Sequence, residues 1–152
     1  MWAGVKVEDL PTVWPQVESL VERGLRRTHG EFALRDVYCN LLAQRWSLWI
    51  FGKDKQKWGI ILTQIYDLPQ KRICEIVLLA CRQGYHFKEL QDEALPILVE
   101  WAKHNECDAL RSTTQRKGLK AAAALGWREI YVEMEYELWQ KVAEASSSQA
   151  KA

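Results

Sequence analysis

Residues 72–87 read RICEIVLLACRQGYHF, an apolar run followed by a short polar turn. Ile73, Ile76 and Val77 belong to a block of β-branched and aliphatic residues that charged residues bound on both sides. Such a block is typical of a strand that is covered on both faces. Because Gly84 follows in the turn, we expect backbone N–H groups to point outward there, where a phosphate group can bind.

A helical pattern follows the turn. Apolar residues recur at steps of three and four, and charged residues fill the positions between them. The apolar positions are Phe87, Leu90, Ala94, Leu95, Leu98, Trp101 and Ala102. Pro96 lies inside the pattern and removes a backbone donor, so we expect the helix to bend or restart there.

The N-terminal part of the chain predicts a short strand and two helices. Residues 5–7 form the strand candidate, and Asp9 is placed to cap the helix that follows. An amphipathic stripe runs through residues 11–25, with proline in the first turn. A second helix is predicted from Leu34 to about Arg45.

The pattern then changes from helices to strands. Residues 46–52 and 58–66 are predicted strands joined by a charged turn at 53–56. A second turn at 67–70 leads into the strand of residues 72–80. The sequence therefore predicts a three-stranded antiparallel meander whose last strand carries the polar turn.

The C-terminal part predicts a strand at 107–112 and an alanine-rich helix at 116–125, closed by Gly126. Apolar and polar residues alternate over residues 130–138, which predicts a final strand. Residues 141–152 are small and polar. We expect them to form a flexible tail, because they bury too little apolar surface to become ordered.

The composition is that of a globular protein. The chain has 152 residues, of which 48% are hydrophobic and 27% charged, and this length favours one domain. A net charge of +1 argues against a broad nucleic-acid surface. No apolar run approaches the roughly 20 residues of a membrane span, and no N-terminal signal segment is visible, so we expect an intracellular product.

Cysteine and tryptophan are the two residue types that call for an interpretation. The four cysteines have no CxxC spacing and no nearby histidine, which predicts reduced, mostly buried thiols and no metal site. Cys81, beside Arg82, is the one thiol that a neighbouring charge could activate. The eight tryptophans either pack in the core or, where exposed together, form a protein interface.

The order of predicted elements resembles that of the GCN5-related N-acetyltransferase (GNAT) superfamily. The likeness covers residues 5–138, and Leu125, Gly126 and Trp127 are similar to the Leu-Gly-Phe that ends the family's fourth helix. The resemblance implies an α/β fold with a mixed, mostly antiparallel central sheet flanked by helices. It also implies a single GNAT-like domain over residues 1–140.

The resemblance further implies an acetyl-CoA site at the turn after the strand of residues 72–80. In the family this turn has the pattern Gln/Arg-x-x-Gly-x-Gly/Ala, and its N–H groups hold the pyrophosphate. Aligning Gly84 with the first glycine places His86 at the second, whereas starting from Arg82 places Tyr85 and Phe87 at the two small positions. Neither alignment completes the motif. The cofactor-binding residues that the resemblance implies are Arg82, Gly84, Tyr85, His86, Phe87 and Gln115.

The family's catalytic positions also differ in this chain. Its Asn-x-x-Ala and its tyrosine fall at Gln115, Gly118 and Ala122. Gln115 still offers an amide, but Ala122 has no proton to give to a leaving thiolate. Glu75 is the candidate carboxylate base, although a strand glutamate is more often a solvated or paired surface residue.

Basic residues gather after the strand of residues 107–112. They are Arg111, Arg116, Lys117 and Lys120. Under the resemblance they would meet the 3′-phosphate of a CoA-like ligand, and otherwise they form a solvated face, which is the interpretation that the sequence favours.

Two classes of function remain open. The first is an acetyl-CoA-dependent N-acetyltransferase whose acceptor amine enters near Glu75 and Tyr66. The second is a fold without chemistry that binds other protein subunits, similar to GNAT-like structural proteins of bacteriophage particles, with Trp2, Trp14 and Trp139 at the interface. The sequence favours the second class, because the turn motif and the tyrosine are both absent.

Overall fold

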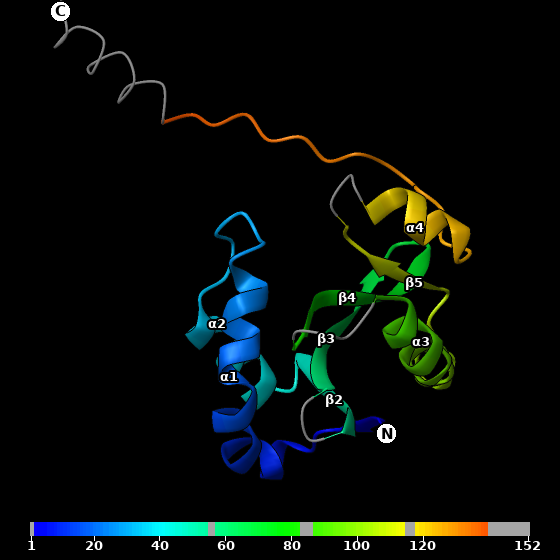
Figure 1. Ribbon diagram of the computed structural model, residues 1–152. Coiled ribbons are helices and arrows are strands. Elements are labelled where there is room, and N and C mark those ends of the chain that lie inside the picture. Colours follow the sequence, from blue (N-terminus) through cyan, green and yellow to red (C-terminus); the bar gives the residue numbers. More distant parts are fainter. Residues whose placement is uncertain (1, 55–56, 83–86, 115–117, 140–152) are drawn as a thin grey trace, which may run out of the picture. The chain divides into compact units, whose positions relative to one another are not determined.

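The computed structural model describes residues 2–54, 57–82, 87–114 and 118–139 (Figure 1). The chain separates into two compact units, Met1–Thr113 and Thr114–Ala152. The first unit holds a five-stranded sheet and its helices, and the second holds one short helix.

The strands of the sheet lie side by side in the order in which they occur along the chain. They are β1 (Trp2–Gly4), β2 (Trp46–Asp54), β3 (Lys57–Leu68), β4 (Lys71–Cys81) and β5 (Ala109–Ser112). The first four pair antiparallel, and β5 pairs parallel to β4. The predicted meander and the mixed, mostly antiparallel sheet are confirmed.

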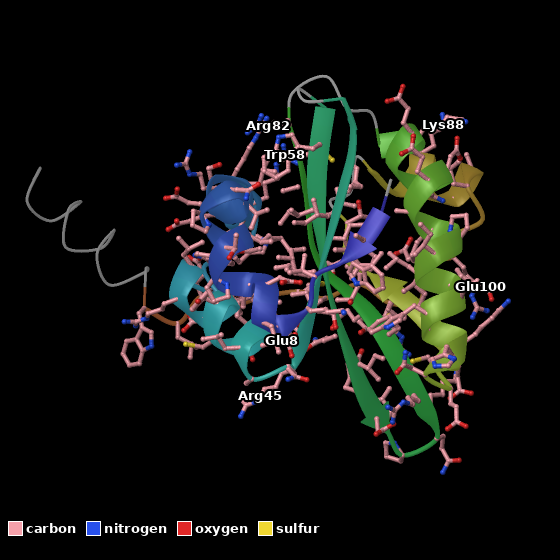
Figure 2. The ribbon with its side chains drawn as sticks, turned by 90° about the horizontal axis from the view of Figure 1, so that it is seen from below. Glu8, Arg45, Trp58, Arg82, Lys88 and Glu100 are labelled. Carbon is pink, nitrogen blue, oxygen red and sulfur yellow. The ribbon has the colours of Figure 1, made fainter. Side chains whose placement is uncertain are left out.

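Helices cover both faces of this sheet. They are the 3₁₀ helix η1 (Val7–Asp9) and the α-helices α1 (Leu10–Leu25), α2 (Leu34–Leu42) and α3 (Phe87–His104). The helices α1 and α2 share a core with one face, and α3 lies on the other face (Figure 2). There Trp101 packs against Trp49. Within the described residues, no helix combines the length and apolar character that crossing a membrane requires.

Helix α1 forms because its apolar stripe is buried. Leu10, Val17, Leu20 and Val21 are at most 4% exposed, and each such aliphatic side chain contributes roughly 1.5–3 kcal/mol when it leaves water. Gly24 lies on the same side, and a Cβ there would come within 2.8 Å of Leu78 Cδ2. The helix therefore packs closely on β4, the strand that carries Glu75.

The N-terminal predictions need two corrections. The strand expected at residues 5–7 is wrong, because β1 ends at Gly4 and η1 begins at Val7. Val5 N still donates to Leu48 O at 2.8 Å, after which the chain turns away from the sheet. The predicted cap is also wrong, since Asp9 occupies the N-cap position of α1 without a side-chain hydrogen bond.

Two helix predictions differ from the structure in detail. Helix α2 ends at Leu42, earlier than the predicted end near Arg45. Helix α3 continues through Pro96, so the restart suggested as one alternative is wrong, and the bend suggested as the other stays a prediction.

In the second unit, α4 (Leu119–Ala124) lies within the predicted helical range, and Gly126 has the positive φ of +92° expected after a helix end. The strand predicted at residues 130–138 is wrong, because residues 127–137 form no regular secondary structure. An alternating pattern stabilises a strand only beside a neighbouring strand, and the described structure provides none for this segment. The predicted tail, residues 141–152, lies outside the described residues.

Candidate functional site

One row of side chains crosses the sheet in register. Trp46 of β2 is paired with Gln64 of β3, Gln64 with Glu75 of β4, and Glu75 with Arg111 of β5. Residues in register on neighbouring strands share a face of the sheet. Trp46 belongs to the core shared with α1 and α2, so the row lies on that face.

Hydrogen bonds run along the row in one direction. Trp46 Nε1 donates to Gln64 Oε1 at 2.9 Å, and Gln64 Nε2 donates to Glu75 Oε2 at 2.5 Å. Because an indole N–H can only donate, it fixes which end of the Gln64 amide faces Glu75. The Glu75 carboxylate is therefore oriented, and its other oxygen, Oε1, has no hydrogen-bond partner among the described residues.

An aromatic contact supports the start of the row. Phe32, in the segment between α1 and α2, packs edge-on against Trp46 with ring centroids 5.1 Å apart. Tyr66, which the sequence placed near the acceptor amine, lies two residues beyond Gln64 on β3 and is half-buried. Side chains alternate along a strand, so Tyr66 shares the face of Gln64 and Glu75.

The edge of β4 opens just beyond Glu75. Val77 is an extra residue in the β3–β4 ladder, because Thr63 pairs with Ile76 while Leu62 pairs with Leu78. Such a bulge bends the strand and disrupts the local pairing. The pairing with β5 also ends at Ile76, so among the described residues no strand lies beside residues 77–81 on that side.

The main-chain groups of Leu79 point into this opening. Arg82 N donates to Trp58 O at 2.9 Å. In an antiparallel pair, every second residue directs its main-chain N–H and C=O toward the neighbouring strand, so Arg82, Ala80 and Leu78 direct theirs toward β3. Leu79 lies between them and faces the opposite side. Among the described residues no strand pairs with its N–H and C=O, so these two groups can hydrogen-bond an extended ligand.

Arg82 itself is already engaged in the structure. Its backbone N–H donates a hydrogen bond to Trp58 O, and its guanidinium lies 4.3 Å from the centre of the Trp58 ring (Figure 2). Of the other predicted cofactor-binding residues, Phe87 begins α3. The remaining predicted residues, Gly84, Tyr85, His86 and Gln115, lie outside the described residues.

Cys81 is not an activated thiol. Burial raises its pKa to about 11, although the nearby Arg27 and Arg23 act in the opposite direction. The thiol therefore stays protonated near neutral pH. In the described part of the chain, no group of three or more His, Cys, Asp or Glu residues could hold a metal ion.

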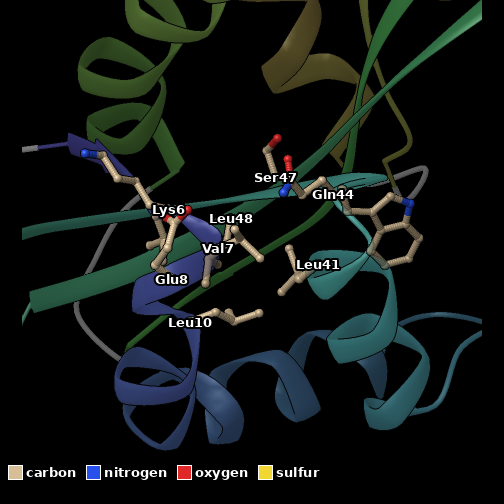
Figure 3. A pocket seen from close by; sticks show the side chains of 10 residues that line it. Lys6, Val7, Glu8, Leu10, Leu41, Gln44, Ser47 and Leu48 are labelled. Carbon is tan, nitrogen blue, oxygen red and sulfur yellow. The ribbon is translucent and has the colours of Figure 1, made fainter.

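A hollow of about 420 Å³ lies between η1, the end of α2 and the start of β2, and Glu75 is not among the residues that line it (Figure 3). Leu10, Leu41 and Leu48 contribute apolar surface to it, as does Trp46, the first member of the row, and Lys6 and Glu8 line it as well. Neither charged side chain is held by a hydrogen bond or ion pair within the described residues. The hollow has room for a small ligand but no oriented catalytic group.

The sequence analysis missed Gln64 and Trp46. A signal for Gln64 was present, because the two residues Pro69 and Gln70 join β3 to β4. A two-residue hairpin turn sets the strand register, and counting back from it places Gln64 opposite Glu75. The direction of the hydrogen bonds has no such signal in the sequence.

No protein-family model matches the chain, and no curated protein matches it either. Solved structures do. One is described as a predicted acetyltransferase from Clostridium acetobutylicum, with acetyl-CoA; it has a TM-score of 0.68 and 14% identity over 92% of this chain and 97% of that one. A ribosomal-protein-alanine N-acetyltransferase from Brucella melitensis biovar Abortus 2308 has a TM-score of 0.65 and 12% identity over 91% and 99%.

An aminoglycoside N-acetyltransferase in complex with CoA has a TM-score of 0.69 and 14% identity over 91% of this chain and 94% of that one. At this level of identity the likeness establishes the fold. The chain has the α/β fold of the GNAT acetyltransferases, with a five-stranded mixed sheet flanked by helices. The predicted fold class is confirmed.

Proposed function

We propose that the chain is an acetyl-CoA-dependent N-acetyltransferase in which Glu75 is the general base. The observation that carries this proposal is the hydrogen bond from Gln64 Nε2 to Glu75 Oε2. It holds a half-buried carboxylate in one orientation, two residues before the bulge at Val77, where the edge of β4 opens. An oriented carboxylate beside an opening is what a general base requires.

The edge of β4 without a described strand partner would bind acetyl-CoA, which supplies the acetyl group as a thioester when it is bound. The N–H and C=O of Leu79, which no described strand pairs with, would hydrogen-bond the amide groups of an extended pantetheine chain. The N-terminus of α3, which begins at Phe87, offers unpaired backbone N–H groups and a positive dipole end to the pyrophosphate. Two of the compared structures, solved with acetyl-CoA and with CoA, share this fold.

Glu75 would take the proton that the acceptor amine loses when it attacks the acetyl carbon. Oε1 is the oxygen for this step, because Oε2 already accepts the hydrogen bond from Gln64. Ala122 stands where the family has its tyrosine, so the proton for the leaving thiolate comes from water. The acceptor approaches the face of the sheet that carries Tyr66 and Glu75.

The interpretation as a subunit of a phage particle stays a prediction, as do its protein partners. None of the three proteins named above is described as part of a particle. Of the tryptophans suggested for an interface, Trp14 is half-buried and packs against Tyr38 at 4.9 Å, whereas Trp139 is 83% exposed.

The test is acetyl transfer by purified wild-type protein and Glu75→Gln protein, measured as thiol release from acetyl-CoA with a panel of amines. We expect Glu75→Gln to lower kcat/KM by about 10²–10⁴, the range of general-base catalysis, and to leave the affinity for acetyl-CoA in calorimetry unchanged. Glu18→Gln, an exposed position on α1, is the matched control and should behave as wild type. Equal rates for wild type and Glu75→Gln would exclude Glu75 as the base, and absence of both binding and transfer would overturn the proposed function.

A further inference from the structure

Arg111 is the fourth member of the row that contains Glu75. The two residues are in register across the parallel pair β4–β5. Neighbouring strands lie about 4.8 Å apart, and residues in register share a face, so the guanidinium of Arg111 projects from the same surface as the Glu75 carboxylate. One side of Glu75 is thus occupied by Gln64, and the other side by a cation.

The guanidinium of Arg111 has no hydrogen-bond or ion-pair partner among the described residues. Arg72 pairs with Asp67 at 3.1 Å, and Arg82 lies over Trp58, but no hydrogen bond or ion pair joins Arg111 to a described residue. Arg111 is half-buried, so an anion bound there would be partly shielded from water. A guanidinium presents a planar fork of donors that matches a carboxylate in a bidentate manner.

The position of Arg111 along the sheet distinguishes between a phosphate of the coenzyme and an anionic group of the acceptor. If the pyrophosphate binds at the turn after β4, it lies beyond Cys81, six residues past Glu75. At about 3.3 Å per residue, this is roughly 20 Å from the row. Arg111 therefore lies beside the acceptor amine and far from the phosphates of the coenzyme.

We propose that the acceptor is an amine that also carries a carboxylate, such as a free amino acid, and that Arg111 binds this carboxylate while Glu75 faces the amine. This inference rests on the proposed function and names its substrate class. In the transfer, Glu75 receives the proton of the amine, the new bond joins the amine nitrogen to the acetyl carbon, and the carbon–sulfur bond of the thioester breaks. CoA leaves as a thiolate that water protonates.

The test compares free amino acids with the corresponding amino acid amides, which keep the amine and lose the negative charge. With acetyl-CoA, we expect wild-type protein to prefer acids over amides by at least tenfold in kcat/KM. Arg111→Gln should remove this preference through a higher KM for the acids, and leave the KM for acetyl-CoA unchanged. Arg111→Lys should restore part of the preference, since it restores the charge without the fork. Arg45→Gln, an exposed arginine between the end of α2 at Leu42 and the start of β2 at Trp46, is the control and should keep the preference.

Three outcomes would overturn the inference. Equal kcat/KM for acids and amides with the wild type would show that no cation binds the carboxylate of the acceptor, while the proposed transferase activity would stand. A higher KM for acetyl-CoA in Arg111→Gln would assign the guanidinium to a phosphate of the coenzyme. Absence of transfer to every acid and every amide would remove the inference together with the proposed function.

Discussion

Trp49 Nε1 donates a hydrogen bond to Thr63 Oγ1 at 3.0 Å, on the face of the sheet opposite to Glu75. Trp49 is 8% exposed and Thr63 is fully buried. The same indole packs edge-on against Trp101 of α3, with ring centroids 5.1 Å apart. One polar pair thus satisfies the only donor of a buried aromatic side chain that connects β2, β3 and α3.

Replacing the acceptor of this bond should destabilise the protein. In Thr63→Val the shape is kept, but the buried N–H of Trp49 loses its partner, which costs about 1–3 kcal/mol. Urea denaturation followed by tryptophan fluorescence would measure the loss. Thr63→Ser, which keeps the hydroxyl, is the control and should lose less. If Thr63→Val unfolds at the same urea concentration as wild type, the hydrogen bond contributes nothing to stability.

Gly59 should not tolerate a side chain. A Cβ at this position would come within 2.3 Å of Phe51 Cζ and 2.7 Å of Ala80 O, and a backbone oxygen within a sheet cannot move away easily. We expect Gly59→Ala to lower the free energy of unfolding by about 1–3 kcal/mol or more, as overpacked cores do. Gly4→Ala is the matched control in β1, where the nearest atom, Trp49 Cζ3, would be 3.5 Å away. Equal stability of the two variants in thermal unfolding would contradict the close approach at Gly59.

The hydrogen bond network of the site gives a third prediction. Gln64→Leu removes the donor to Glu75 and leaves the N–H of Trp46 without its acceptor. We expect kcat to fall, because the carboxylate is no longer oriented, and the KM for acetyl-CoA to stay the same. Gln70→Leu, in the exposed turn between β3 and β4, is the control for the loss of an amide. Unchanged kcat in Gln64→Leu would mean that Glu75 needs no positioning.

Residue patterns alone predicted the meander, because each of its strands is long and is bounded by turn residues. The predicted site was less complete. Glu75 was named as a candidate base from its position on a strand, but its orientation depends on Gln64, which is eleven residues away in the chain. To predict this hydrogen bond, one must know the register of the two strands and the orientation of the Gln64 side-chain amide. The periodicity of apolar residues in the sequence gives neither.

In the segment 130–138, by contrast, a strong sequence pattern predicted a strand that the structure does not form. Its alternation is the clearest strand signal in the sequence, yet the structure forms no strand there, and Val132 and Met134 are 65% and 88% exposed. Alternation reports that one face of a segment would be buried in a sheet. It carries no information about which neighbour would provide the pairing, and without pairing an extended segment gains no ladder hydrogen bonds.

Thiol reactivity gives the last prediction, with its pH dependence. The four cysteines are free; Cys39 is exposed, Cys74 is buried, and Cys81 is half-buried. Burial raises the pKa of Cys74 to about 12 and that of Cys81 to about 11, so both keep their protons at pH values where an ordinary thiol begins to ionise. Since the thiolate is the reactive form, only a small fraction of Cys81 is reactive at pH 8.

We therefore expect iodoacetamide at pH 8 to modify Cys39 first and to leave Cys74 unmodified until the protein unfolds. The rate at Cys81 should rise nearly tenfold for each pH unit up to about pH 10, because the thiolate fraction rises in this way below the pKa. Mass spectrometry of peptides after timed alkylation at several pH values measures all three sites, and circular dichroism at each pH shows that the protein is folded. Modification of Cys81 as fast as Cys39 at pH 8 would show that Arg23 and Arg27 outweigh burial, and would make this thiol a nucleophile after all.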